Sequence, residues 1–183
     1  CSIAEAKEWA EALSMCGLSL NAAHDPFKVI WKDRPTVPTE KAVIMPCEVS
    51  GESAAGKLQR LRQQLSKNGV EGMLVTMLDE VAWLTNMRGN DVAYNPVVVS
   101  YLLVTTKTAT LFILPEKLTP AVLAHLAESD IAVADYNEVW GALAAYNGDS
   151  ILLQPTRCNR AVLEHLNPAC QPVFKDSPVA AMK

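Results

Sequence analysis

The stretch VVVSYLLVTTKTATLFIL, residues 97–114, holds two apolar runs joined by a short polar connection. The runs at 97–105 and 108–114 are rich in valine, leucine and other large apolar residues, a composition typical of buried strands. Thr106 and Lys107 between them suit the tight connection of a hairpin. We therefore expect an antiparallel pair of strands here, which argues against a purely parallel sheet.

Strands and helices alternate on both sides of this pair. Short apolar runs predict strands, and runs with apolar residues at helical spacing predict helices. This order predicts an α/β fold with a mixed, mostly parallel sheet flanked by helices. The further expected strands are residues 72–76, 131–134, 150–154 and 171–174, and the expected helices are residues 53–68, 120–128, 138–146 and 159–166.

The N-terminal residues predict two shorter elements. Residues 4–15 place apolar side chains at helical spacing among acidic ones, which indicates an amphipathic helix that ends at Gly17. Residues 18–21 then predict a short strand.

A proline-rich stretch follows these elements. Proline cannot continue a helix, so several prolines within a dozen residues favour an extended and fairly stiff connection. We place a domain boundary between Asp33 and Ser50, with a partial domain and linker at 1–50 and a full domain at 51–183. The prolines are Pro35, Pro38 and Pro46.

The charge of the chain excludes some classes of partner. Its 183 residues carry a formal net charge of −4, and the basic residues are scattered. Binders of nucleic acids and membrane surfaces rely on clustered Lys and Arg, so we expect neither a nucleic acid nor a membrane as partner. The one loose basic group is expected to form the solvated face of a helix: Lys57, Arg60, Arg62 and Lys67.

The apolar stretches, the first residues and the cysteines indicate where in the cell the chain is expected to reside. No apolar stretch approaches the ~20 residues that cross a bilayer, and the start lacks an initiator Met and a signal-peptide pattern. We expect a soluble segment cut from a longer protein. The five cysteines include no CxxC pair, which favours reduced thiols in a cytoplasmic protein: Cys1, Cys16, Cys47, Cys158 and Cys170.

The residue patterns of common catalytic sites are missing from the sequence. His24, His125 and His165 stand apart, without the HExxH spacing of a zinc peptidase. There is no GxSxG elbow and no glycine-rich phosphate loop. We therefore expect no catalytic residue, metal or cofactor in this chain.

The densest polar cluster lies at residues 85–96, between two apolar segments. A loop of this composition can be a turn whose side chains bond to its own backbone. It can also present Arg88 and Asp91 to a ligand or to a neighbouring domain, because loops on a rigid sheet often carry function. The structural alternatives are that Arg88 pairs with Asp91 or that it caps a helix, and the residues alone leave the structural and the functional interpretations open.

Three motifs in this sequence carry a resemblance to one family. The sequence LDEVAWLTNMRGNDV at 78–92, followed by YNPV at 94–97, resembles the pattern LDEIAWLxNxRGxDVxxNP of cytosolic-type Xaa-Pro aminopeptidases, or aminopeptidase P. The stretch DPFKVIWKDRP at 25–35 is similar to the family segment NLVDxIWxxRPxxP, although its Asp25-Pro26 start departs from the pattern. SPVAAMK at 177–183 is similar to the segment just before the catalytic domain of that family.

The resemblance implies an architecture that the chain represents only in part. Members of the family have two creatinase-like α/β domains followed by a C-terminal "pita-bread" domain that holds two Mn(II) ions. It implies that residues 1–50 are the tail of a first domain plus the linker, that residues 51–183 are the second domain, and that the catalytic domain is absent. Partners would then be the catalytic domain, an Xaa-Pro peptide substrate and a second copy in a homodimer.

The resemblance also gives the polar loop a candidate role. Arg88, Asp91 and Asn95 would face the substrate cleft or the boundary between domains, with Trp83 as a further candidate. The chain would shape the cleft, control access and support oligomerisation without catalysis. The alternatives are a stand-alone creatinase-like domain that binds a protein or peptide, and a prolidase or creatinase with another substrate.

Overall fold

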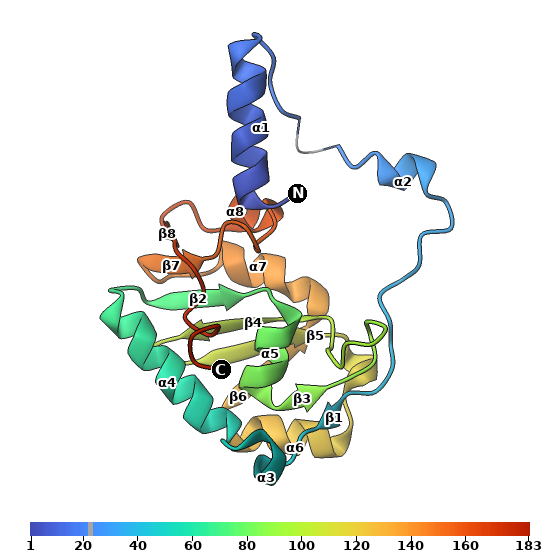
Figure 1. The fold of residues 1–183 in the computed structure, drawn as a ribbon, viewed down its shortest axis with the longest axis vertical. Coiled ribbons are helices and arrows are strands. Elements are labelled where there is room, and N and C mark those ends of the chain that lie inside the picture. Colours follow the sequence, from blue (N-terminus) through green and yellow to red (C-terminus); the bar gives the residue numbers. More distant parts are fainter. Residues whose placement is uncertain (22–23) are drawn as a thin grey trace.

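A computed structural model describes residues 1–21 and 24–183 of the chain. Within these residues the apolar runs form a six-stranded sheet in the order β6-β5-β4-β2-β7-β8 (Figure 1). The strands are β2 (Gly72–Val75), β4 (Ser100–Thr105), β5 (Ala109–Ile113), β6 (Ile131–Asp135), β7 (Ser150–Leu153) and β8 (Gln171–Phe174).

The strand directions confirm a mixed, mostly parallel sheet. β4 pairs antiparallel with β5 across the connection at Thr106 and Lys107, so the predicted hairpin is confirmed. β4 also pairs antiparallel with β2. The pairs β2 with β7, β5 with β6, and β7 with β8 are parallel.

Helices cover both faces of this sheet. On one face lie α4 (Ala54–Lys67), α5 (Leu78–Thr85) and α6 (Pro120–Glu128), and on the other lie α7 (Val139–Ala144) and α8 (Ala161–His165). The predicted helices at 138–146 and 159–166 are present but shorter than expected. Short 3-10 turns precede two of the helices, η1 (Pro115–Lys117) before α6 and η2 (Tyr136–Glu138) before α7.

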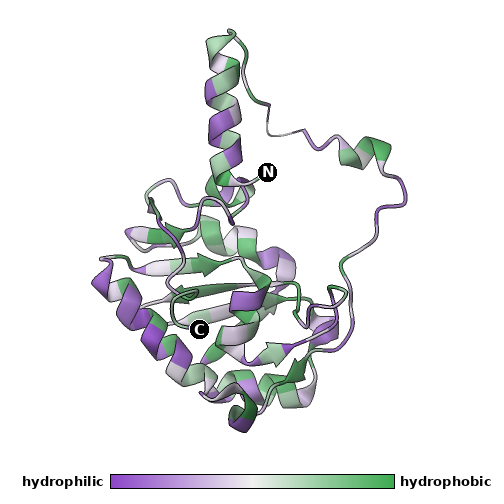
Figure 2. Ribbon diagram, viewed as in Figure 1, coloured by the Kyte–Doolittle hydropathy of each residue, from purple (hydrophilic) through white to green (hydrophobic). Residues whose placement is uncertain are grey.

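Two hydrophobic cores follow from alternation along the strands, because successive side chains of a strand point to opposite faces. Met73 and Val75 of β2 pack under α4 and α5, whereas Leu74 between them packs toward α7 and α8. Apolar residues therefore fill the strands, and polar residues lie on the outer surface of α4 (Figure 2). Strands buried on both faces give the continuous apolar runs of the sequence.

The N-terminal residues lie at one end of this layered body. α1 (Ile3–Met15) begins with a capping box at Ser2 and projects beyond the sheet (Figure 1). Its first turn is attached by two backbone bonds, from Ile3 N to the Cys158 carbonyl at 2.9 Å and from Ala4 N to the Pro155 carbonyl at 3.0 Å. None of the helices in the described parts of the chain is long and apolar enough to span a lipid bilayer.

The predicted strand at 18–21 is wrong. These residues are irregular, Leu18 is 61% exposed, and Gly17 turns the chain through a positive φ of 72°. The backbone N–H and C=O groups of a strand need a second strand as hydrogen-bond partner. The apolar pattern of four residues does not show whether such a partner strand is present. The next helix, α2 (Phe27–Ile30), also leaves its apolar side chains exposed.

The proline-rich stretch passes close to the polar loop. It contains β1 (Val43–Ile44), which pairs antiparallel with β3 (Met87–Arg88), followed by α3 (Cys47–Ser50). Met45 N donates to the Asn86 carbonyl at 2.7 Å, and Ala42 N donates to the Lys117 carbonyl at 2.9 Å. This stretch therefore fixes the backbone on which Arg88 stands, while the boundary between Asp33 and Ser50 stays a prediction.

Candidate functional site

The residues of the polar loop follow directly from the end of α5. Asn86 ends this helix in a left-handed conformation, with φ 54°, which turns the chain sharply into β3. Asparagine tolerates this conformation better than most residues. Trp83 thus lies in the last turn of α5, Arg88 lies on β3, and Asn95 lies in the exposed loop beyond it.

Three of the four predicted site residues line one hollow. Trp83, Arg88 and Asn95 surround a shallow depression of about 230 Å³, together with Asp79, Ala82, Pro96, Val97 and Lys183. The spacing of these residues in the sequence indicated that they lie on or beside one loop. Only the fold brings Lys183 to the same hollow. The hollow is therefore built by α5, β3, the loop and the C-terminal residues.

Asp91, the fourth predicted residue, lies inside the domain instead. Its two carboxylate oxygens are 2.6 and 2.7 Å from Nζ of Lys117, and it accepts a bond from Val99 N at 2.6 Å. The side chains of Lys117 and Asp91 are 0% and 1% exposed. Of the two structural alternatives, the pair between Asp91 and Arg88 is wrong, because the carboxylate is taken up by Lys117. The other alternative, a helix cap, agrees with the bond from Arg88 to the Ala82 carbonyl of α5.

Arg88 is half-buried at the C-terminal end of α5. Its Nη1 donates to the Ala82 carbonyl at 2.6 Å and to the Met87 carbonyl at 2.8 Å. A cation is favoured at this end of a helix, where carbonyls lack partners within the helix. Burial lowers the pKa of Arg88 from its ordinary value, since desolvation disfavours the charged form.

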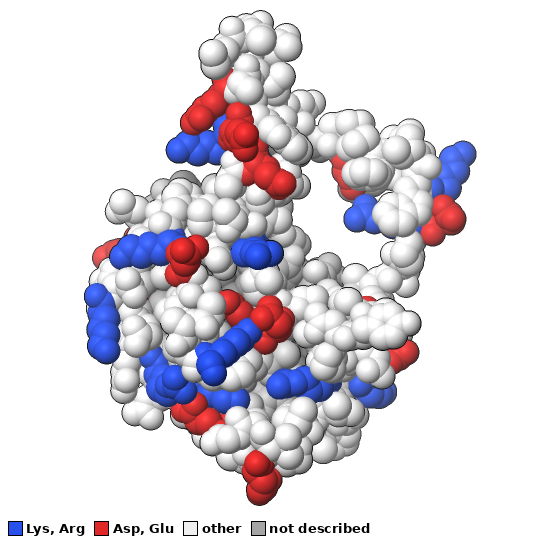
Figure 3. Space-filling view, in the orientation of Figure 1, with Lys and Arg blue, Asp and Glu red and all other residues white. Residues whose placement is uncertain are grey.

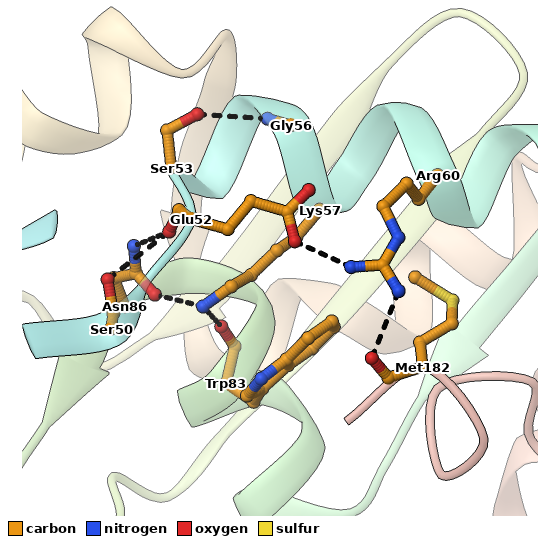
Figure 4. Close-up of polar contacts among 9 residues, drawn as sticks. All are labelled: Ser50, Glu52, Ser53, Gly56, Lys57, Arg60, Trp83, Asn86 and Met182. Atoms are coloured by element: carbon orange, nitrogen blue, oxygen red, sulfur yellow. Dashed lines mark hydrogen bonds and ion pairs between the residues drawn. The ribbon is translucent and has the colours of Figure 1, made fainter.

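Trp83 lies beside two basic side chains of α4, Lys57 and Arg60 (Figure 4). Nζ of Lys57 lies 4.6 Å from the centre of an indole ring and donates to the Trp83 carbonyl at 3.1 Å. It also donates to Asn86 Oδ1 at 2.5 Å. Arg60 lies 5.9 Å from the ring centre on α4, a distance at which a cation and an aromatic face still attract.

The prediction that Lys57 lies on a solvated helix face is wrong, because Lys57 is only 1% exposed. A signal for this was present in the sequence: Ala54, Lys57, Leu58 and Leu61 fall at positions i, i+3, i+4 and i+7, on the buried face of α4. Desolvation lowers the pKa of Lys57, and the charge of Arg88 lowers it further, while Glu52 opposes the shift.

The last residues of the chain are attached beside the hollow. Ser177 Oγ donates to Glu80 Oε2 at 2.7 Å, and Arg60 Nη2 donates to the Met182 carbonyl at 3.0 Å. Lys183 pairs with Asp79, and Val179 is fully buried. Sequence reasoning missed the buried Glu80 and Lys117, because no local pattern marks their partners, which lie 97 and 26 positions away.

Metal-ligating side chains do not gather in the parts of the chain that the structure describes. Among residues 1–21 and 24–183 no group of three or more His, Cys, Asp or Glu could hold a metal ion. Among the same residues no cysteine forms a disulfide. His125 bonds to the Thr85 carbonyl through Nε2 at 2.8 Å, as an ordinary packed histidine does.

The topology and the hollow define a class of protein, a three-layer α/β domain with its polar loop beside its C-terminal residues. Residues 33–183 match the family model described as "Creatinase/Prolidase N-terminal domain". The chain belongs to this family.

Curated relatives are Xaa-Pro aminopeptidases. The chain is 45% identical over 112 residues to a "Probable Xaa-Pro aminopeptidase P" of Fusarium vanettenii, covering 61% of this chain and 18% of that protein. It is 38% identical over 148 residues to one of Leptosphaeria maculans, covering 80% of this chain and 24% of that protein. The chain thus spans about a quarter or less of these relatives.

Solved structures of an X-prolyl aminopeptidase and of a peptidase N-terminal domain also match this chain. An X-prolyl aminopeptidase from Caenorhabditis elegans, described as "a cytosolic enzyme with a di-nuclear active site", matches with a TM-score of 0.88 and 27% identity. The match covers 100% of this chain and 31% of that one. The N-terminal domain of PepQ from Mycobacterium tuberculosis matches with a TM-score of 0.50 and 15% identity, over 70% of this chain and 98% of that one, which supports the fold alone.

Proposed function

We propose that this chain is the non-catalytic N-terminal portion of an Xaa-Pro aminopeptidase. The complete enzyme removes the N-terminal residue from peptides that have proline at the second position. Support comes from aminopeptidase relatives that are about four times longer than the matched part.

The catalytic chemistry then belongs to a domain that follows this chain. Two Mn(II) ions would be held there by residues outside this chain, and they would supply activation of water, because metal ions lower the pKa of bound water. The residues described here bind and position, and they take no part in bond breaking. A cytoplasmic location and a homodimer complete the proposal.

The observation that carries this role is the position of the hollow beside Lys183. Trp83, Arg88 and Asn95 line this hollow together with Asp79 and Lys183. We assign these three residues to the boundary between the domains or to the wall of the substrate cleft. Asp91 serves the same site indirectly, because its buried pair with Lys117 holds the base of the loop.

Alanine variants in the full-length enzyme test this role. Arg88→Ala and Asn95→Ala are expected to lower kcat/KM for an Xaa-Pro peptide. Lys107→Ala is the control, since Lys107 is exposed at the opposite end of β4 from the loop. If Arg88→Ala and Asn95→Ala leave both the kinetics and the thermal stability unchanged, the assignment of the hollow is wrong.

The stand-alone binding domain remains the contrasting case. It predicts that the gene encodes no catalytic domain after Lys183 and that the natural product has no peptidase activity. Sequencing the transcript beyond this codon decides between the two functions.

A further inference from the structure

Arg88 presents an unused edge of its guanidinium. The two hydrogen bonds of this group both use Nη1. Over residues 1–21 and 24–183, no carboxylate forms an ion pair with Arg88, and no protein acceptor bonds to its Nε or Nη2. A guanidinium has five N–H donors, so most of the donors of Arg88 have no acceptor among the described protein residues.

The acidic groups nearby are already engaged. Asp79, which lines the hollow, pairs with Lys183. Asp91 is enclosed with Lys117, and Glu52 is 2.6 Å from Nη1 of Arg60. Because these three carboxylates already have cationic partners, none of them neutralises Arg88. The surroundings of Trp83 therefore carry an excess of positive charge.

The surroundings make this excess charge costly. Arg88 is half-buried, and the apolar side chains of Ala82, Trp83, Pro96 and Val97 form walls of the hollow. A cation in such a place loses part of its hydration, and a bound anion would compensate for that loss. The lowered pKa values of Arg88 and Lys57 have the same cause, which is burial.

The geometry of arginine selects the anion. Nε and one terminal nitrogen form a planar fork that matches the two oxygens of a carboxylate. The exposed Asn95 lies on the same hollow, and its amide nitrogen adds a neutral donor.

We propose that the hollow is a carboxylate-binding site, formed by Nε and Nη2 of Arg88 with the amide of Asn95 beside them. The identity of the carboxylate rests on the function proposed above. It is either the C-terminal carboxylate of a peptide substrate or an acidic side chain of the catalytic domain. Both sources offer the same chemical group, so the site is tested first with that group alone.

Acetate is the first probe, because it tests the site without any enzymatic activity. The Nε–Hε NMR signals of the arginines in this 183-residue chain are recorded during titration with sodium acetate, and again with sodium chloride at equal ionic strength. Arg88→Lys assigns the Arg88 signal. A saturable shift of that signal in acetate alone supports the site, and a shift no larger than that in chloride overturns it. The exposed Arg157 is the internal control.

Kinetics of the full-length enzyme then identify the source of the carboxylate. Arg88→Met and Arg88→Lys are compared with Arg157→Met, using Xaa-Pro-Yaa peptides with a free C-terminus or a C-terminal amide. Loss of a bidentate bond between charged groups is expected to lower kcat/KM by about tenfold or more. The lysine variant keeps a donor for the Ala82 carbonyl, so it separates a lost carboxylate site from a misfolded helix end.

Each kinetic outcome has one meaning. A loss confined to the free-acid peptide assigns the site to substrate. An equal loss with both peptides, together with faster proteolysis just after Lys183, assigns it to an acidic side chain of the catalytic domain. Unchanged kinetics and unchanged proteolysis in both Arg88 variants overturn the inference, whereas an inactive wild-type enzyme counts against the proposed function only.

Discussion

The carboxylate of Asp91 and the ammonium of Lys117 form a closed pair, with N–O distances of 2.6 and 2.7 Å and side chains that are 1% and 0% exposed. Asp91 also accepts the Val99 amide, so the pair fixes the point where the polar loop enters β4. The two residues that the sequence places near the site thus have different tasks: Arg88 lines the hollow, and Asp91 holds the loop.

Breaking the pair between Asp91 and Lys117 is expected to lower the stability of the chain strongly. Lys117→Met leaves the Asp91 carboxylate buried without its cation, which should lower the free energy of unfolding by about 3–5 kcal/mol. Lys183→Met is the control, because its pair with Asp79 is partly exposed and should contribute at most about 1 kcal/mol. Urea denaturation of both variants measures the difference, and equal effects would contradict the account.

Lys57 should behave as a buried donor. Lys57→Met leaves Asn86 Oδ1 and the Trp83 carbonyl without their partner, at a cost of about 1–3 kcal/mol. Lys67→Met, at the exposed end of the same helix, should change stability by no more than about 0.5 kcal/mol. Thermal denaturation compares the two, and a Lys57 variant as stable as the Lys67 variant would show that the buried bonds contribute little.

The buried carboxyl of Glu80 is expected to make the stability of the chain depend on pH. Burial raises its pKa from the ordinary 4.5, and the bond from Ser177 opposes that shift. An acid with a raised pKa in the folded state holds more protons when folded, so stability falls as pH rises from about 4.5 through the raised value. Glu80→Gln removes this titration and should keep the bond to Ser177.

Melting temperatures across this pH window test the prediction. The glutamine variant should gain on the wild type as pH rises, because only the wild type must ionise a buried carboxyl. Ser177→Ala should extend the fall to higher pH, since it removes the bond that favours the charged form. A constant difference between Glu80→Gln and the wild type at every pH would rule out the effect.

Tyr94 is a strained residue in the isolated domain. Its φ is 62°, and it is 107% exposed, so the ring packs against nothing that would offset the strain. Tyr94→Gly is expected to stabilise the chain by up to about 1 kcal/mol, because glycine adopts this conformation freely. Tyr94→Ala keeps the Cβ atom and should give no such gain. Chemical denaturation of both variants measures this, and a loss of stability in the glycine variant would contradict it.

The sequence predicted the layered fold well and its long-range pairs poorly. Apolar periodicity is local, so it located the strands and the hairpin at Thr106 and Lys107. It could not reveal that Lys117 would enclose Asp91, or that β1 would pair with β3, since both depend on how distant segments meet. A strand at 18–21 was wrongly predicted for the same reason, because a short apolar run does not specify a neighbour.

The candidate site was predicted in outline. The polar composition of residues 85–96 and the family motif indicated Arg88, Asp91, Asn95 and Trp83. The fold brings three of these together with Lys183 and turns the fourth inward. The charges in view are intermingled, with no extended face of one sign, which fits a site defined by individual side chains (Figure 3).

Hydrolysis of an Xaa-Pro peptide in the presence of added Mn(II), by this 183-residue chain and by the full-length product of its gene, tests the central claim most directly. Release of the N-terminal residue is expected with the full-length protein, and none with the 183-residue chain. Hydrolysis by the 183-residue chain would contradict the claim that these residues bind and position without catalysis.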